Sequence, residues 1–186
     1  MSSALLTRSE AAQLSGASSV AVKKAIDQGV IPARSVKRAS LVEAEDVGLL
    51  ALLALIQDAQ LPVAQKKRLR SWLRSSGSAA ELELSPALVV RRTPEVGEAV
   101  ARAERYARLR EKWIVTDEER RAGGEPIIKG SRVSVYTIAG RLAAGDSDQA
   151  LELDYPHIPA EAREVAAAYG SASPRRGRPR RIARQP

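Results

Sequence analysis

Residues 124–135 restrict the fold of this chain more than any other segment, because two glycines and a proline fall within seven positions. Gly124 and Gly130 can adopt positive φ angles at little cost, so each suits a tight turn. Pro126 has no N–H to donate, and a strand that contains it must lie at a sheet edge or begin at the proline. We therefore expect a short extended piece at residues 126–128 between two turns.

The sequence that follows predicts three short helices. Ser134 suits the N-cap of a helix that closes at Gly145. A carboxyl or hydroxyl at residues 146–147 would cap a second helix, and Pro159 is acceptable at the start of a third. Three short helices joined by tight turns indicate a bundle similar to a helix-turn-helix.

These residues resemble a domain of unknown function that occurs in many prokaryotic type II antitoxins, VapB-like proteins encoded beside PIN-like ribonuclease toxins. The resemblance covers residues 113–170, and its core is G-x-P-x-I-x-G-[TS]-R-[IV]-x-V. Ser131 keeps the hydroxyl of the threonine that is more usual there, whereas Glu152 stands where an aliphatic residue is usual. The residues that carry the resemblance are Gly124, Pro126, Ile128, Gly130, Ser131, Arg132, Val135, Tyr155 and Pro156.

The N-terminal residues have the pattern of another helix-turn-helix. Thr7 and Glu10 have capping-box spacing at the start of a helix. Gly16 then interrupts the chain, and Ser18 or Ser19 can cap a second helix. Two short helices about a turn that contains glycine are the arrangement of a helix-turn-helix.

A basic stretch at residues 33–42 follows and predicts a hairpin wing. Residues 5–50 thus predict two short helices, a basic hairpin and the start of another helix, in that order. This arrangement resembles the winged helix-turn-helix of MerR-like and excisionase-like DNA-binding proteins. The resemblance implies that the second helix faces the groove or the phosphates and that the wing reaches the backbone or the minor groove. The alternative is that these cations only solvate the helix and the hairpin. The candidate DNA-binding residues are Ser18, Ser19, Lys23, Lys24, Arg34, Lys37 and Arg38.

The distribution of charge favours local contacts with DNA. The net charge is +8, but residues 170–186 hold six arginines and no acid. Residues 1–169 therefore carry 24 basic side chains and 22 acidic ones, a net charge of only +2. Any DNA contact by the folded part must therefore come from local clusters.

The C-terminal tail contains an R-G-R-P core similar to an AT-hook, whose arginines enter a narrow A·T minor groove. Without a hydrophobic pattern we expect it to be disordered until bound. A tail that binds phosphates without specificity is an equal alternative. A lesser one is an arm that inserts an arginine among the metal-binding carboxylates of a PIN-like toxin. The candidate contacts to DNA or toxin are Arg175, Arg176, Arg178, Arg180 and Arg181.

The segment between the two units predicts connecting helices and a hairpin. Residues 63–75 carry five cations around Leu69 and Trp72, which we interpret as a solvated helix face rather than a second DNA surface. The long helix expected at residues 95–112 suits a dimer contact or a connector. In the last helix we expect Glu161, Arg163 and Glu164 to lie exposed, a face of mixed sign that suits a protein partner better than DNA.

The expected fold is mainly α with short β-hairpins: an N-terminal winged helix-turn-helix plus a C-terminal three-helix domain similar to a helix-turn-helix. The expected divisions are residues 1–60, 61–112 and 113–170, with a disordered tail at 171–186. No segment is apolar for long enough to cross a bilayer, and cysteine is absent. We expect a cytoplasmic protein, associated with the nucleoid when bound to DNA.

An enzyme is not indicated, since the chain has one histidine and no residues at metal-ligand spacing, so we expect neither cofactor nor metal. The sequence predicts the antitoxin of a type II pair, a homodimer that binds a PIN-like ribonuclease toxin and represses its own promoter. The alternative is a free-standing MerR-like or excisionase-like transcription regulator without a toxin. A structural nucleoid protein is a third possibility, which rests only on the tail.

Overall fold

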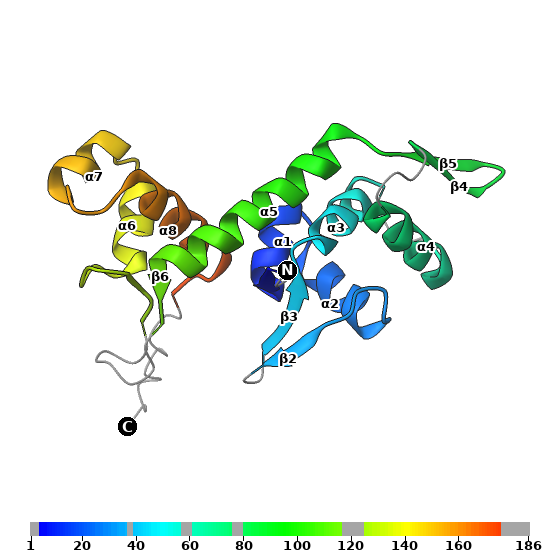
Figure 1. The fold of residues 1–186 in the computed structure, drawn as a ribbon, viewed down its shortest axis with the longest axis horizontal. Helices are drawn as coiled ribbons and strands as arrows, with labels where there is room; N and C mark the ends of the chain where they lie inside the picture. The colour runs from blue at the N-terminus through cyan, green and yellow to red at the C-terminus, as the bar shows by residue number, and fades with distance from the viewer. Residues whose placement is uncertain (1–3, 37–38, 57–60, 76–79, 117–124, 176–186) are drawn as a thin grey trace, which may run out of the picture.

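The computed structural model is mainly helical with short antiparallel hairpins, as the sequence predicted. Figure 1 shows helical units at either end of one long helix, α5 (Pro94–Trp113), which runs through the middle of the molecule. The structure describes residues 4–36, 39–56, 61–75, 80–116 and 125–175.

The N-terminal unit contains a helix-turn-helix and a three-stranded antiparallel sheet of order β1-β3-β2. Leu6 pairs with Val42 in this sheet, and both side chains are fully buried. The elements are β1 (Leu5–Thr7), α1 (Arg8–Ser15), α2 (Ser19–Asp27), β2 (Arg34–Val36), β3 (Ala39–Glu43) and α3 (Asp46–Leu55).

The middle of the chain adds a helix, a hairpin and α5. The hairpin strands β4 and β5 pair antiparallel with an irregularity between Glu83 and Ser85. The long helix has Pro94 at its first turn, where the missing N–H costs nothing. The bounds are α4 (Val63–Arg74), β4 (Glu81–Ser85) and β5 (Leu88–Arg91).

Helix α3 is the centre of the larger hydrophobic core. Every residue from 46 to 53 is buried, because α1, α4 and α5 pack around the helix. Leu69 of α4 and Val96 of α5 belong to this core, so these two helices contribute to it as well as connecting the two units. Each fully buried leucine stabilises the fold by about 1.5–3 kcal/mol. No described helix combines the length and apolarity needed to cross a membrane.

The C-terminal unit has its own smaller core. Ile114 pairs with Ile128 across a two-stranded ribbon, and Ile128, Ile138 and Leu151 are buried together. The elements are β6 (Ile114–Val115), β7 (Ile127–Ile128), α6 (Val135–Ala143), α7 (Asp148–Asp154) and α8 (Ala160–Ala172). Gly170 lets α6 and α8 approach closely, because a Cβ there would lie 2.4 Å from the Cβ of Ala139.

The capping residues predicted for this unit are largely confirmed. Ser134 caps α6 by accepting from the Tyr136 N–H at 3.2 Å, and Ser147 caps α7. Gly145, which follows α6, has a φ of 96°. Pro159 differs by one position: it is the N-cap of α8, and the helix begins at Ala160.

Candidate nucleic-acid interface

The helix-turn-helix is held by two side-chain caps. The Thr7 N–H donates to Glu10 Oε2 at 2.7 Å, and Thr7 Oγ1 accepts from the Glu10 N–H at 3.3 Å, which completes the predicted capping box. Gly16 ends α1 with a φ of 73°. Ser18 caps α2 by accepting from the Ala21 N–H at 3.1 Å, so its hydroxyl already has a partner within the protein.

Helix α2 buries one face and exposes the other. Val22 and Ala25 are buried against the core, while Lys23 forms an ion pair with Asp27 on the exposed side. Lys24 has no ion pair within the described part of the chain and its charge is available to an external anion. The predicted DNA-binding residues of this helix, Ser18, Ser19, Lys23 and Lys24, are all exposed.

The predicted wing is the hairpin formed by β2 and β3. Ser35 pairs with Ser40 and Val36 with Ala39, and all four residues are exposed. Arg34 lies at the base of the hairpin, where its side chain is 65% exposed. The other two predicted wing residues, Lys37 and Arg38, lie outside the described residues.

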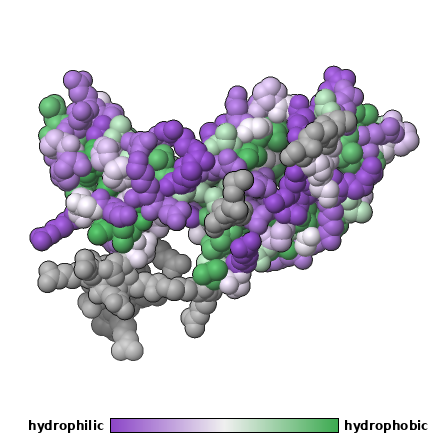
Figure 2. All heavy atoms as spheres, in the orientation of Figure 1, coloured by the Kyte–Doolittle hydropathy of each residue, from purple (hydrophilic) through white to green (hydrophobic). Residues whose placement is uncertain are grey.

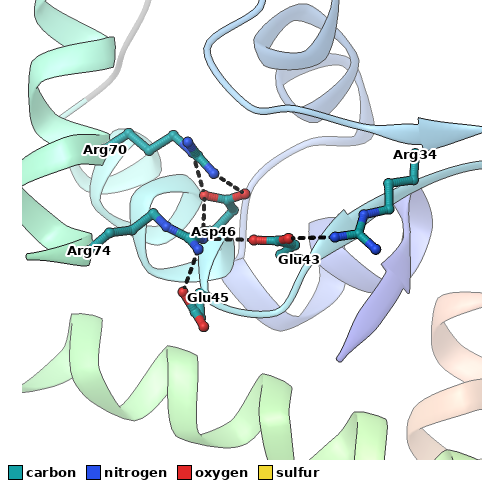
Figure 3. A network of polar contacts seen from close by, with 6 residues as sticks. All are labelled: Arg34, Glu43, Glu45, Asp46, Arg70 and Arg74. Carbon is teal, nitrogen blue, oxygen red and sulfur yellow. Dashed lines mark hydrogen bonds and ion pairs between the residues drawn. The ribbon is translucent and has the colours of Figure 1, made fainter. Parts of the chain in front are cut away.

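A network of ion pairs, shown in Figure 3, supports the base of this hairpin. The Asp46 carboxylate is fully buried and accepts from Arg70 at 2.7 and 3.1 Å. Arg74 bridges Asp46 at 3.6 Å and Glu43 at 3.0 Å. Glu43 in turn lies 3.4 Å from Arg34, so a chain of alternating charges runs from α4 to the wing.

The network corrects the prediction that the cations of residues 63–75 form a solvated face. Arg70 and Arg74 pair with carboxylates, and Lys66 is only 2% exposed. Among the five cations, Lys67 and Arg68 are exposed without an ion pair to a described residue. The two paired arginines are four residues apart and therefore share one helix face, which was the only sequence signal for this network.

A second polar cluster joins α1 to α5. Glu10 is 1% exposed, accepts from the Tyr106 hydroxyl at 2.7 Å and forms an ion pair with Arg110. Arg110 also donates to the Leu5 carbonyl at 2.6 Å. Burial and the nearby Glu10 charge raise the pKa of Tyr106 far above its ordinary value, so the phenol keeps its proton and donates it. We call Glu10, Tyr106 and Arg110 the Glu10 clamp.

Two ion pairs join the same C-terminal half of α5 to α8. Glu164 accepts from Arg105 at 3.0 and 2.6 Å, and Glu161 accepts from Lys112 at 2.7 Å and from the Trp113 indole at 3.3 Å. The hydrogen bonds from Arg105 and Lys112 lower the pKa values of the two carboxyls. Glu164 is exposed as predicted and Glu161 is partly exposed, and both carboxylates are directed to α5.

Arg163 contradicts the sequence prediction. Its side chain is 3% exposed and donates to both Asp148 oxygens, at 2.7 and 2.6 Å, and to the Ile158 carbonyl at 2.7 Å. The prediction that Arg163 is exposed is wrong, because α7 packs on α8 and covers the residue. The α8 face therefore presents no free arginine to a partner at this position.

The antitoxin-like motif builds a turn and a core rather than one polar site. Ile128 and Val135 are buried, and Gly130 has a φ of 79°. Ser131 donates to the Ile128 carbonyl at 2.9 Å and accepts from the Val133 N–H at 3.2 Å, which explains why a hydroxyl suits this position. Of the other motif residues, Pro126 is buried, Tyr155 half-buried, Arg132 and Pro156 exposed, and Gly124 outside the described residues.

The basic tail is described only at its start. Arg175 is 70% exposed and forms an ion pair with Glu125. The remaining predicted tail contacts, Arg176, Arg178, Arg180 and Arg181, lie outside the described residues.

The visible surface is mostly hydrophilic. In Figure 2, polar side chains cover most of the described surface and hydrophobic ones form small separate patches. Within the described ranges, no group of three or more histidine, aspartate or glutamate side chains could hold a metal ion.

Comparison with known proteins gives a family but no activity. Residues 114–169 match the family described as "Protein of unknown function (DUF433)", nearly the segment over which the antitoxin resemblance was drawn. The protein named "Uncharacterized protein y4eO" of Sinorhizobium fredii is 30% identical over 192 residues, which cover 95% of this chain and 85% of that protein. No solved structure matches this chain. The similarity to y4eO therefore extends over the N-terminal unit as well as the matched C-terminal domain.

Proposed function

We propose that this chain, which belongs to the same family as y4eO, is a DNA-binding antitoxin of a type II toxin–antitoxin pair. The observation that carries the DNA-binding part is the juxtaposition of α2 and the β2–β3 hairpin. The hairpin follows α2 directly along the chain, and in Figure 1 it projects away from α5. Lys24 on the helix and Arg34 on the hairpin both extend into solvent from these two elements. A basic helix face beside a basic hairpin suits a major groove and the adjacent phosphates.

The support beneath these elements favours the same function. The apolar face of α2 packs on the core, and α4 holds the base of the hairpin through Arg74 and Glu43. Recognition of a duplex requires the helix and hairpin to keep a fixed spacing, which a packed core provides. One short recognition helix gives limited affinity, so we propose that two copies bind two half-sites of the promoter as a homodimer.

The toxin-binding part rests on the resemblance of residues 113–170 to the antitoxin domain. The C-terminal unit has its own smaller core, although Val165 of α8 also packs into the larger one, and it lies on the opposite side of α1 and α5 from the α2 face. A toxin bound to this unit would leave the α2 face open to DNA. We propose a PIN-like ribonuclease as this partner, and Arg132 is an exposed motif residue available to it.

The DNA-binding proposal predicts the effect of neutralising Lys24 and Arg34. We expect the Lys24→Gln/Arg34→Gln variant to bind the DNA upstream of its own coding sequence more weakly. The slope of log affinity against log salt should become shallower by about 2, because each phosphate that is no longer neutralised reduces it by about 0.9. Fluorescence anisotropy at several salt concentrations measures both the affinity and its salt dependence.

An Arg91→Gln/Arg102→Gln variant, which removes two exposed charges elsewhere, is the matched control. An equal weakening in the control would contradict the assignment.

The antitoxin proposal predicts a stable complex with the product of the neighbouring small open reading frame. We expect the tagged chain to co-purify with that product and the ribonuclease activity of the partner to appear only after its release. Deletion of residues 171–186 tests the tail, because unchanged inhibition would exclude a toxin-directed arm. Binding to its own upstream DNA without any co-purifying partner would instead support the free-standing regulator.

A further inference from the structure

Val20 is an apolar side chain in an unusual place. It is 76% exposed on the first turn of α2, whereas Val22 and Ala25 of the same helix are buried. The helix is otherwise divided into an apolar buried face and a polar exposed one. Core packing therefore does not account for the valine at position 20.

The position of Val20 relates it to the two lysines of the helix. Residues three and four apart lie on the same face of an α-helix, so Val20 shares its face with Lys23 and Lys24. Contacts from the lysines to phosphates would bring this face against the duplex. The second helix of a helix-turn-helix contacts base edges through its N-terminal residues, and Val20 is the second residue of α2.

The chemistry of valine limits what it can recognise there. Its isopropyl group neither donates nor accepts a hydrogen bond, so it cannot read the polar atoms of a base edge. In the major groove the C5-methyl group of thymine is the apolar feature that distinguishes one base from the others. Ser18 does not compete for this role, because its hydroxyl caps the helix.

We infer that Val20 is a specificity-determining residue that packs against the C5-methyl group of one thymine in each bound half-site. The inference rests on the proposed DNA binding and adds the base that the helix selects. Burial of one methyl group is worth about 0.8 kcal/mol, which corresponds to a weakening of about fourfold in affinity when that methyl is removed.

Uracil substitution tests the inference, because uracil is thymine without the methyl group. Sites are first selected from a pool of randomised duplexes with the full-length protein, and each thymine of the selected site is then replaced singly by uracil. We expect one position in each half-site at which the replacement weakens the wild-type protein about fourfold. Val20→Ala should lose this sensitivity and keep its response at every other position.

Lys24→Gln is the matched control on the same helix face. It should weaken all duplexes by a similar factor and keep the uracil effect, because a phosphate contact carries no base preference. Val20 is exposed, so Val20→Ala should unfold at nearly the same denaturant concentration as the wild type, which denaturant titration verifies. Binding without a Val20-dependent methyl effect overturns the inference and leaves the proposed function standing. Failure to select any DNA overturns both.

Discussion

Replacing Arg110 by methionine is expected to lower the free energy of unfolding by about 3–5 kcal/mol. The change leaves the Glu10 carboxylate buried without its ion-pair partner and removes the hydrogen bond to the Leu5 carbonyl. Methionine retains much of the aliphatic packing of arginine, so the decrease reports mainly on the charge. Chemical denaturation followed by circular dichroism measures it.

Two further variants make this result specific to the Glu10 clamp. Arg102→Met removes an exposed arginine of the same helix, whose contact with Glu98 is 3.9 Å long, and should cost less than about 1 kcal/mol. The double variant Glu10→Gln/Arg110→Met removes both charges and should be more stable than Arg110→Met alone, because no unpaired charge is left buried. A double variant less stable than the single one would show that the clamp acts through packing instead.

The second large effect is expected at Arg70. Arg70→Met leaves the fully buried Asp46 carboxylate with Arg74 alone, 3.6 Å away, and should lower the free energy of unfolding by about 3 kcal/mol. Asp46 begins α3, the helix around which the larger core is built. We therefore expect the N-terminal unit to unfold in one cooperative transition. Thermal unfolding and denaturant titration should both show the decrease in stability.

Arg68→Met is the comparison on the same helix. Arg68 is exposed and donates to the Glu83 carbonyl at 3.1 Å, so its replacement should cost no more than about 1 kcal/mol. If Arg68→Met and Arg70→Met were equally destabilising, the buried position of Asp46 would not be the cause. A normal stability for Arg70→Met would mean that Arg74 alone can neutralise Asp46.

The C-terminal half of α5 links the N-terminal unit, which faces DNA in the proposal, to the C-terminal unit. The Glu10 clamp fixes α5 to α1, and the Arg105–Glu164 and Lys112–Glu161 pairs fix it to α8. The partly exposed pairs are individually weak, whereas the buried clamp is costly to break. The long helix is thus a connector, one of the two roles that the sequence allowed for it.

Local chemistry explains why the helix boundaries were predictable. Thr7, Ser18, Ser134 and Ser147 each cap a helix with their own hydroxyl, and the motif glycine Gly130 takes the positive φ that its turn needs. These effects depend on residues at most four positions apart. They are therefore present in the sequence itself, whatever the rest of the chain does.

The burial of Arg163 could not be predicted from local sequence patterns. A charged residue in an alanine-rich helix is usually exposed, yet α7 covers Arg163 and supplies Asp148 as its partner. Which face of α8 meets α5, and which meets α7, depends on packing between elements distant in the sequence.

The sequence by itself determined the short-range features of this protein: its caps, its turns, its aliphatic α3 and the basic residues of α2 and the hairpin. Only the tertiary structure decided which charges are neutralised inside the molecule. Glu10 and Arg110 are 100 residues apart, and Asp46 and Arg70 are 24 apart, so no periodicity relates them. Burial turns these pairs into strong constraints, because an ion removed from water must be neutralised where it lies.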